Sequence, residues 1–216
     1  MARLARVYFP VTALGPGRRL GVWFQGCSIA CPGCMSRDTW AADGGTVVPD
    51  DWFAGTWAEA LSRGATGLTV SGGEPTEQPQ SLLALLRTVR SGPVPHGTEP
   101  ADVLVYTGRS RTEFAALVPG GADLVDALVT GPYRVSEPTD LIWRGSANQR
   151  LHLLSDLGRE RYADYEQYRP EQPPMQFVVD DDKVSYVGVP RTGALPRIER
   201  SLRAADVHLG RSSWRP

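Results

Sequence analysis

Three cysteines stand together in the nine residues GCSIACPGC, at positions 26–34. They are Cys27, Cys31 and Cys34, and the chain of 216 residues contains no others. Three is an odd count, and separations of four and three residues are too short for a framework of disulfides. In a cytosolic chain such a group binds metal or does redox chemistry.

Two kinds of metal chemistry suit clustered thiolates. A structural zinc site takes four ligands, whereas this stretch supplies three and no histidine. His96, His152 and His208 are distant in sequence, and His96, in its loop, is the best candidate for a fourth ligand. A four-iron cluster held by three cysteines instead leaves one iron without a protein ligand, as a catalytic cluster requires. Both chemistries remain open at this point.

A second motif, SGGEP at residues 71–75, directly follows a predicted strand. By itself it is typical of a strand-to-helix turn, in which Gly72 and Gly73 permit unusual backbone angles and Glu74 favours the next helix N-terminus. Alternatively, two residues without side chains let backbone groups approach a ligand closely. The motif alone is compatible with both interpretations.

The elements that must position these motifs form a regular pattern. Strand-like segments at 17–25, 67–70, 102–108 and 122–131 alternate with helical ones, which predicts an α/β fold with a parallel sheet. The cysteines, SGGEP, Thr107-Gly108 and Thr130-Gly131-Pro132 each follow one of these strands. Because the carboxyl ends of parallel strands meet at one rim, we expect the four segments to converge there.

The helices between the strands have recognisable ends. Asp50 or Asp51 is the predicted N-cap of the first, which stops at Gly64, and Gly92 ends the second. Ser110 and Glu113 have the spacing of a capping box that opens the third. The residues predicted to face the core are Phe53, Trp57, Ala60, Leu61, Leu82, Leu85, Leu86, Val89, Phe114, Leu117 and Val118.

The chain beyond residue 154 has a different composition. Residues 155–174 are polar, with tyrosines at three-residue spacing, and predict a linker with a short helix. Residues 175–190 alternate apolar and polar side chains around an acidic turn at 180–182, which predicts a β-hairpin. Ile198 and Leu202 then lie on one face of a short amphipathic helix. We therefore expect a core at 1–154 and a C-terminal unit at 155–216 that packs on it.

Composition excludes two classes of partner. The net charge is −1 and the basic residues are scattered, so we expect no nucleic acid, which requires a concentrated basic face. The longest apolar runs, such as 82–86, are too short to span a membrane. The N-terminal residues lack the apolar stretch of a signal peptide, so a cytoplasmic protein is expected.

The motif CSIACPGC resembles the CxxxCxxC signature of the radical S-adenosylmethionine (radical SAM) superfamily. The resemblance implies that Cys27, Cys31 and Cys34 ligate a [4Fe-4S] cluster whose open iron binds S-adenosylmethionine. The reduced cluster cleaves this cofactor to a 5′-deoxyadenosyl radical, which removes a hydrogen atom from a substrate. A zinc site or a non-catalytic metal-binding module is the alternative from another class.

The turn GGEP, one strand after the cysteines, resembles the motif with which this superfamily binds the methionyl ammonium of the cofactor. Gly33 and Met35 flank the last cysteine, and Thr107 ends a strand at the same rim. The residues that we expect at the cofactor are Gly33, Met35, Gly72, Gly73, Glu74 and Thr107.

Further stretches resemble one branch, the small glycyl-radical enzyme activases typified by the anaerobic ribonucleotide reductase activating proteins. They are GPGRR at 15–19, VLVYTG at 103–108, and DALVTGPYR with WRGSANQR between 126 and 150. The resemblance implies an incomplete (β/α) barrel of radical SAM type, with the C-terminal hairpin and helix added to it. It also implies a glycyl-radical enzyme as partner and reduced flavodoxin or ferredoxin as electron donor.

Some positions depart from the family pattern. Many members have an aromatic residue beside the adenine where this chain has Gly33, so adenine contacts must come from elsewhere. Met35 replaces a residue that is often polar, and the part beyond 154 exceeds the compact activases. That part could cover the open side of the barrel or bind a different partner, so a peptide, nucleoside or other small metabolite is the alternative substrate. Asn148, Gln149 and Arg150 suit either a satisfied polar loop or a contact to cofactor or partner.

Overall fold

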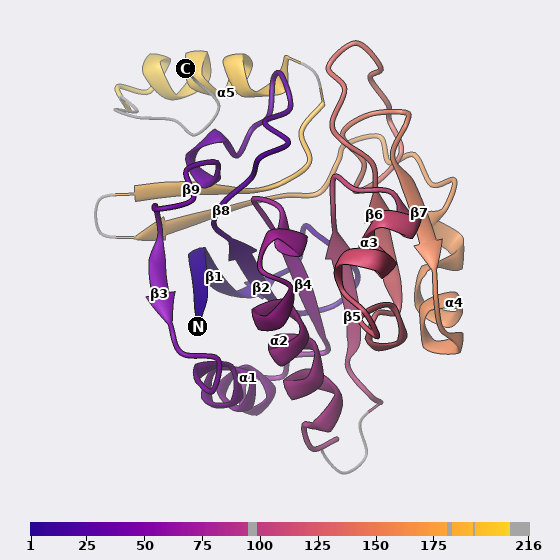
Figure 1. Cartoon of the computed structure of the whole chain (residues 1–216). Coiled ribbons are helices and arrows are strands. Elements are labelled where there is room, and N and C mark those ends of the chain that lie inside the picture. Colours follow the sequence, from indigo (N-terminus) through magenta and orange to yellow (C-terminus); the bar gives the residue numbers. More distant parts are fainter. Residues whose placement is uncertain (95–98, 181–182, 192, 208–216) are drawn as a thin grey trace.

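The computed structural model describes residues 1–94, 99–180, 183–191 and 193–207, and a seven-stranded sheet lies at its centre (Figure 1). The strand order is β3-β1-β2-β4-β5-β6-β7. The central strands β2, β4, β5 and β6 are parallel, and β1, β3 and β7 are antiparallel to their neighbours. The strands are β1 (Ala2–Val11), β2 (Arg19–Phe24), β3 (Thr46–Val48), β4 (Gly67–Gly72), β5 (Asp102–Tyr106), β6 (Ala127–Thr130) and β7 (Arg150–Leu153).

The four predicted strands are all present, as β2, β4, β5 and β6. The last is shorter than the predicted 122–131, because one turn of 3₁₀ helix, η3 (Ala122–Leu124), precedes it. Its four residues are buried, as its continuous apolar run predicted. The register pairs Phe24 of β2 with Gly72 of β4, so the segments that follow these two strands begin at the same level.

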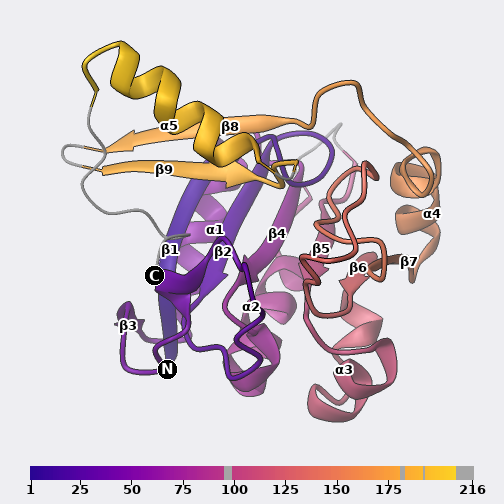
Figure 2. The same cartoon turned by 90° about the horizontal axis from the view of Figure 1, so that it is seen from above.

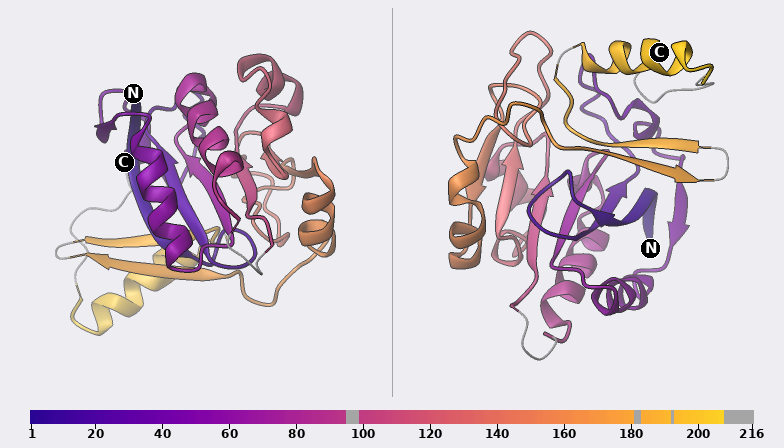
Figure 3. Two further views of the ribbon diagram at one scale, coloured as in Figure 1. Left: turned by 90° about the horizontal axis from the view of Figure 1, so that it is seen from below. Right: turned by 180° about the vertical axis from the view of Figure 1, so that it is seen from behind.

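Three helices cover one face of the sheet (Figure 3). They are α1 (Trp52–Ser62), α2 (Pro79–Ser91) and α3 (Arg111–Leu117). The predicted apolar faces pack in the core, except that Leu117 is 44% exposed because α3 ends at this residue. Within the described ranges, no helix has the length and apolar character needed to cross a membrane.

The predicted capping box of α3 is confirmed, and Asp51 stands at the predicted N-cap position of α1 but without a side-chain hydrogen bond. In the capping box of α3, Glu113 N–H donates to Ser110 Oγ at 3.2 Å, and Ser110 N–H donates to the Glu113 carboxylate at 2.8 Å. Asp51 precedes α1 but makes no side-chain cap. The Asp50 carboxylate accepts hydrogen bonds from the N-terminal ammonium at 2.7 Å and from Ser81 Oγ at 2.8 Å. It therefore ties the chain start to α2 instead of capping α1.

A buried ion pair ties the sheet to the segment after residue 154. Arg19 of β2 and Asp102 of β5 are fully buried, and their Nη2 and Oδ2 atoms lie 2.7 Å apart. Arg161 and Tyr162, at the end of α4 (Asp156–Tyr162), donate further hydrogen bonds to the same carboxylate. The predicted short helix is therefore confirmed, but it is anchored in the core and is not a free linker. The division at residue 154 stays a prediction.

The predicted hairpin is confirmed as β8 (Met175–Asp180) and β9 (Lys183–Gly188), although its turn at 181–182 lies outside the described residues. The hairpin crosses the molecule on the face away from α1 and α2 (Figures 2 and 3). There Val178 and Val187 pack with Val11 and Trp23 of the sheet. Helix α5 (Ala194–Ala204) lies over the hairpin, with Ile198 and Leu202 only half-buried.

Strands β1, β3 and β7 were not predicted. Of β7, only the first residue, Arg150, belongs to a stretch for which a polar loop was one of two alternatives. All three are antiparallel additions to the parallel centre, and their pairing joins residues far apart in sequence, such as Ala2 with Val48. Such pairing leaves a weaker local signal than a buried parallel strand does.

Candidate functional site

A cavity of about 410 Å³ opens at the carboxyl ends of the parallel strands. It is lined by the cysteine loop, by residues 71–74 at the end of β4, by residues 106–108 at the end of β5, and by Gly131 after β6. The predicted convergence of four segments is therefore confirmed. Residues 143–149 contribute one further wall, and the C-terminal hairpin with the start of α5 contributes another.

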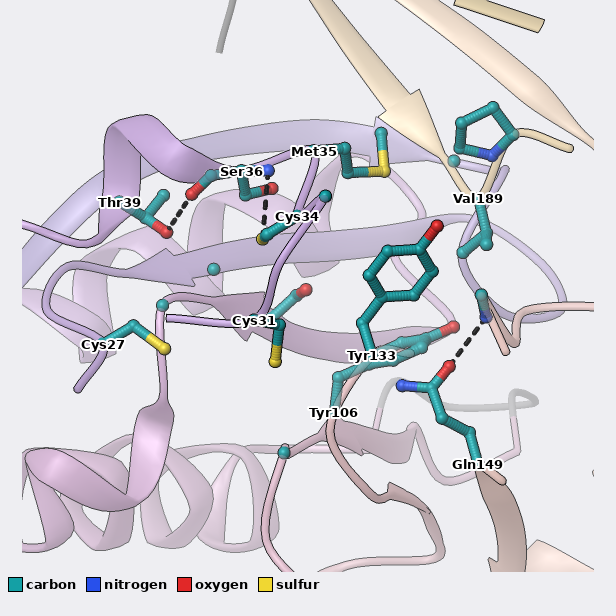
Figure 4. A pocket seen from close by; sticks show the side chains of 18 of the residues that line it. Cys27, Cys31, Cys34, Met35, Ser36, Thr39, Tyr106, Tyr133, Gln149 and Val189 are labelled. Atoms are coloured by element: carbon teal, nitrogen blue, oxygen red, sulfur yellow. Dashed lines mark hydrogen bonds between the residues drawn. The ribbon is translucent and has the colours of Figure 1, made fainter. Parts of the chain in front are cut away.

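The three cysteines lie at one end of this cavity (Figure 4). All are half-buried and free of disulfides. The loop that carries them is fastened at its start, where Gly26 N–H donates to Thr39 O at 2.8 Å and Cys27 N–H donates to Trp40 O at 3.1 Å. The loop has left-handed backbone at three positions, Gly26 (φ 98°), Ala30 (φ 46°) and Gly33 (φ 77°).

Backbone N–H groups surround the sulfur atoms. Ser36 N–H donates to Cys34 Sγ at 3.4 Å. Burial raises the pKa of Cys27 and Cys31, and hydrogen bonds from neighbouring backbone groups oppose this rise. For Cys31 the opposing group is that of Tyr133, which reaches it from the segment after β6. Such donors stabilise a thiolate that is bound to iron.

The donor set fits an iron–sulfur cluster better than a single ion. Among the described residues, no group of three or more His, Cys, Asp or Glu side chains is arranged to hold a metal ion by itself. In a cubane the cysteine thiolates bind different irons, so they do not converge on one point. His152, a candidate zinc ligand, lies on β7 with Nε2 3.0 Å from Thr130 Oγ1 and does not line this cavity. His96 and His208 lie outside the described residues.

The two glycines of the 71–75 turn allow it to lie against the start of the cysteine loop. Gly72 has φ +110°, and a Cβ there would lie 2.4 Å from Phe24 N and O. A Cβ on Gly73 would lie 2.1 Å from Gly26 O. Gly73 N–H donates to Phe24 O, and Glu74 N–H to Gly26 O, both at 2.8 Å. The close approach expected of these glycines is thus made to the cysteine loop, and their contact with a cofactor stays a prediction.

Glu74 is 1% exposed, and its carboxylate joins the ends of β4 and β5. Oε1 accepts from Thr76 N–H at 3.1 Å, Thr76 Oγ1 at 2.8 Å and Thr107 Oγ1 at 2.7 Å. Oε2 accepts from Gly108 N–H at 2.7 Å. Thr107 is itself buried and accepts from Arg109 N–H at 3.0 Å. Every polar group of this small network has a partner inside the protein.

Glu77 is a site residue that the sequence analysis missed. Its Oε1 accepts from Ser28 N–H at 2.7 Å and Ser28 Oγ at 2.6 Å, so it holds the loop between two cysteines. Arg109 lies 3.9 Å from the same oxygen. The available signal was a second glutamate three residues after Glu74, in the turn η2 (Pro75–Glu77) that follows the glycines.

The remaining expected residues lie around the same cavity. Gly33 and Met35 both line it, and Tyr133 Cε1 lies 3.4 Å from where a Cβ on Gly33 would stand (Figure 4). An aromatic ring therefore covers this glycine from another segment. The side-chain amide of Gln149 has partners within its loop. Its Oε1 accepts from Gly145 N–H at 2.7 Å, and its Nε2 donates to Gly131 O at 3.0 Å.

The two other polar residues of that stretch do not line the cavity. Asn148 Nδ2 donates to Pro132 O at 2.8 Å, whereas its Oδ1 has no partner within the described part of the chain. Arg150 is exposed and begins β7. The polar-loop alternative therefore accounts for Gln149 and only in part for Asn148.

Comparison with known proteins gives matches over the same part of the chain. Residues 13–152 match the family described as 4Fe-4S single cluster domain. The chain is 32% identical over 153 residues to the anaerobic ribonucleoside-triphosphate reductase-activating protein of Escherichia coli K12, covering 68% of this chain and 96% of that protein. The protein of that name from Salmonella typhimurium is 34% identical over 158 residues, with the same coverage. That of Enterobacteria phage T4 is 31% identical over 144 residues, covering 66% of this chain and 88% of the phage protein.

Proposed function

Since this chain belongs to the 4Fe-4S single cluster family and is a relative of anaerobic ribonucleoside-triphosphate reductase-activating proteins, we propose that it activates a glycyl-radical enzyme by radical SAM chemistry. One observation carries the proposal: three free thiols and the Gly-Gly-Glu turn meet at one end of a cavity. A bound [4Fe-4S] cluster with S-adenosylmethionine supplies a one-electron cleavage of the sulfonium and a 5′-deoxyadenosyl radical that abstracts hydrogen.

Cys27, Cys31 and Cys34 are the proposed ligands of three irons. The fourth iron is left for the cofactor, because no other cysteine exists in the chain and no histidine lines the cavity within the described residues. The N–H donors around the sulfurs stabilise the thiolate form that binds iron. Glu77 keeps the loop in place through Ser28.

The turn at 72–74 is the proposed site of the cofactor's amino group. Of the two Glu74 oxygens, Oε1 accepts three hydrogen bonds and Oε2 accepts one. Oε2 therefore retains capacity to accept from an ammonium group. Thr107 acts through Glu74, because its hydroxyl donates to that carboxylate.

Apolar groups contribute more of the cavity lining than polar groups do. Apolar side chains from both walls line it, including Leu14, Trp23, Met35, Val187 and Val189. Its volume of about 410 Å³ is in the lower part of the range for small-molecule sites.

The remaining expectations follow from the same proposal. Four parallel strands with helices on one face support an incomplete (β/α) barrel of radical SAM type. The partner is an anaerobic ribonucleoside-triphosphate reductase, the enzyme named in the relatives, and the electron donor is reduced flavodoxin or ferredoxin. Reduced thiols and a low-potential donor require the cytoplasm as compartment.

The test is anaerobic reconstitution with iron and sulfide, followed by reduction in the presence of S-adenosylmethionine. We expect 5′-deoxyadenosine, and a glycyl-radical EPR doublet once the anaerobic reductase of the source organism is added. Cluster-loaded protein that makes no 5′-deoxyadenosine contradicts the proposal. If 5′-deoxyadenosine forms but label reaches it from a deuterated small molecule instead of the reductase, the substrate is a metabolite and the partner assignment is wrong.

A further inference from the structure

The cavity lining has unpaired polar atoms. Within the described part of the chain, Trp40 Nε1, Tyr106 Oη, Trp143 Nε1 and Tyr186 Oη are buried and have no hydrogen-bond partner. All four residues line the cavity. Trp40 follows the cysteine loop, whereas the other three come from β5, from the loop before β7 and from β9. Unpaired buried polar atoms are rare in proteins because each costs about 1–3 kcal/mol. Four around one cavity indicate a ligand that pairs them, and three of the four lie outside the cysteine segment.

Trp143 adds a second, independent sign. Its φ is +59°, a left-handed backbone conformation that is an outlier for a bulky residue. The indole is 5% exposed and held in place by two rings, Tyr165 at 4.6 Å and Tyr162 at 5.8 Å between centroids. Strained backbone that packing keeps in place is concentrated at binding and catalytic sites.

Tyr186 comes from the C-terminal hairpin. Its ring packs edge-on against Phe177 of β8, with centroids 5.7 Å apart. The neighbouring Val187 is 1% exposed and belongs to the apolar cluster that fastens the hairpin to the sheet. Tyr8 Oη and Ser185 Oγ, 2.6 Å apart, add a polar link between hairpin and sheet. The Tyr186 hydroxyl is thus presented by a docked element.

These groups define the chemistry of the ligand. Burial raises the pKa of both tyrosines, that of Tyr186 to about 12, so their hydroxyls keep the proton and can donate it. An indole N–H only donates. The charged side chains that line the cavity in the described residues are Glu74, at the cysteine end, and Arg191, which is paired with Asp140 at 3.1 Å. The hairpin end therefore suits an uncharged ligand rich in acceptors, and not a phosphate or an amine.

The part of the chain that is shared with the relatives and the part that follows it are expected to serve different ligands. The family match ends at residue 152, and the E. coli relative is covered over 96% of its length by 68% of this chain. A cofactor used by the whole family does not require an element that follows the shared region. Tyr186 and the hairpin follow it, so they serve what is particular to this protein, namely the molecule that receives the radical.

We propose that Tyr106, Trp143 and Tyr186 form a subsite for the backbone carbonyl groups of an uncharged, extended segment of the partner polypeptide. The proposal rests on the proposed function, because the segment is the one that carries the hydrogen to be abstracted. Tyr186 makes the C-terminal hairpin a determinant of specificity toward the partner.

The test uses the full-length, cluster-loaded protein and the anaerobic reductase of the source organism as probe. Binding of the reductase in the presence of S-adenosylmethionine is compared for Tyr106→Phe, Trp143→Phe and Tyr186→Phe, and cofactor binding is measured separately. Each variant keeps an aromatic ring and loses one donor. Tyr168→Phe is the matched control, since this tyrosine is 49% exposed and does not line the cavity.

We expect Tyr186→Phe to weaken binding of the reductase roughly three- to tenfold, the effect of losing one hydrogen bond. Its affinity for S-adenosylmethionine and that of the control for both ligands should match wild type. Weaker cofactor binding by Tyr186→Phe, or unchanged reductase binding in all three variants, overturns the subsite. Wild type that cleaves the cofactor but does not bind the reductase also overturns it, whereas wild type that does neither overturns the proposed function itself.

Discussion

Two groups on the cavity lining, the carboxylate of Glu74 and the hydroxyl of Tyr106, differ in how they are paired. At the cysteine end, Glu74 is 1% exposed and accepts four hydrogen bonds from Thr76, Thr107 and Gly108. At the hairpin end, Tyr106, one residue before Thr107, has a buried hydroxyl without a partner in the described chain. The hydrogen bonds of Glu74 are made without a ligand, so this network holds its shape alone, although Trp40 Nε1 on the same cavity lining has no partner in the described chain. The hairpin end is completed only by what binds there.

The largest effect should come from the cysteines. Cys31→Ala is expected to abolish cluster incorporation and all cofactor cleavage, because three thiolates are the minimum that holds the cluster. Iron content and 5′-deoxyadenosine are the measurements. The melting temperature should stay close to that of wild type, since the side chain is only half-buried. Full iron content in this variant would contradict the assignment of Cys31 as a cluster ligand.

Glu74→Gln tests whether the cysteine end holds itself together. The amide keeps the shape but turns one acceptor into a donor that faces existing donors, so we expect a loss of about 2–4 kcal/mol in the free energy of unfolding. Urea denaturation of the protein without a cluster measures it. A loss of similar size in Tyr186→Phe would erase the contrast between the ends.

The pH dependence of stability tests a second buried carboxylate that is fully hydrogen-bonded, Asp102 at the start of β5. Burial opposes its charge, but the cation of Arg19 and hydrogen bonds from Arg19, Tyr162 and Arg161 outweigh burial and lower the pKa of Asp102. A lowered folded pKa means stability that is fully present above the unfolded value, about 3.9, and is lost as the pH falls through the folded value.

Urea denaturation between pH 7 and pH 3 should therefore show no loss from this group until the pH is below about 4. In Arg19→Met the carboxylate loses its cation while still buried, so its folded pKa rises and the acid-induced loss from this group should be smaller than in wild type. An unchanged profile in this variant would show that Arg19 does not hold the charge of Asp102.

The smallest expected effects on stability come from removing two neighbouring hydroxyls, one with hydrogen-bond partners and one without. Thr107→Val removes a hydroxyl that donates to Glu74 and accepts from Arg109 N–H, and should cost about 1–2 kcal/mol in unfolding free energy. Tyr106→Phe removes one without a partner, and should change stability by less than about 0.5 kcal/mol or increase it. Equal losses would contradict the assignment of one hydroxyl to structure and the other to binding.

Local signals account for what could be predicted. The cysteine spacing, the glycines after β4, the capping box at Ser110 and the alternation of the hairpin are each written within a few residues, and their elements are present. Convergence of the strand ends followed from one general property of parallel sheets. The antiparallel strands β1 and β7 escaped prediction, because their pairing partners, and not their own patterns, make them strands.

Long-range contacts account for what could not be predicted. The link from Glu77 to Ser28 joins residues 49 apart, and that from Tyr162 to Asp102 joins residues 60 apart. Tyr106 and Tyr186 line one cavity although they are far apart in the sequence. Neither segment has a sequence pattern that indicates its contact with the other.

The amino-acid sequence by itself determined the chemistry, because three thiols and a glycine turn carry their reactivity and their backbone freedom wherever the chain puts them. Only the tertiary structure decided which polar atoms would be paired and which left for a ligand. Pairing depends on distances between segments that folding brings together, and those distances also place the C-terminal hairpin over the cavity.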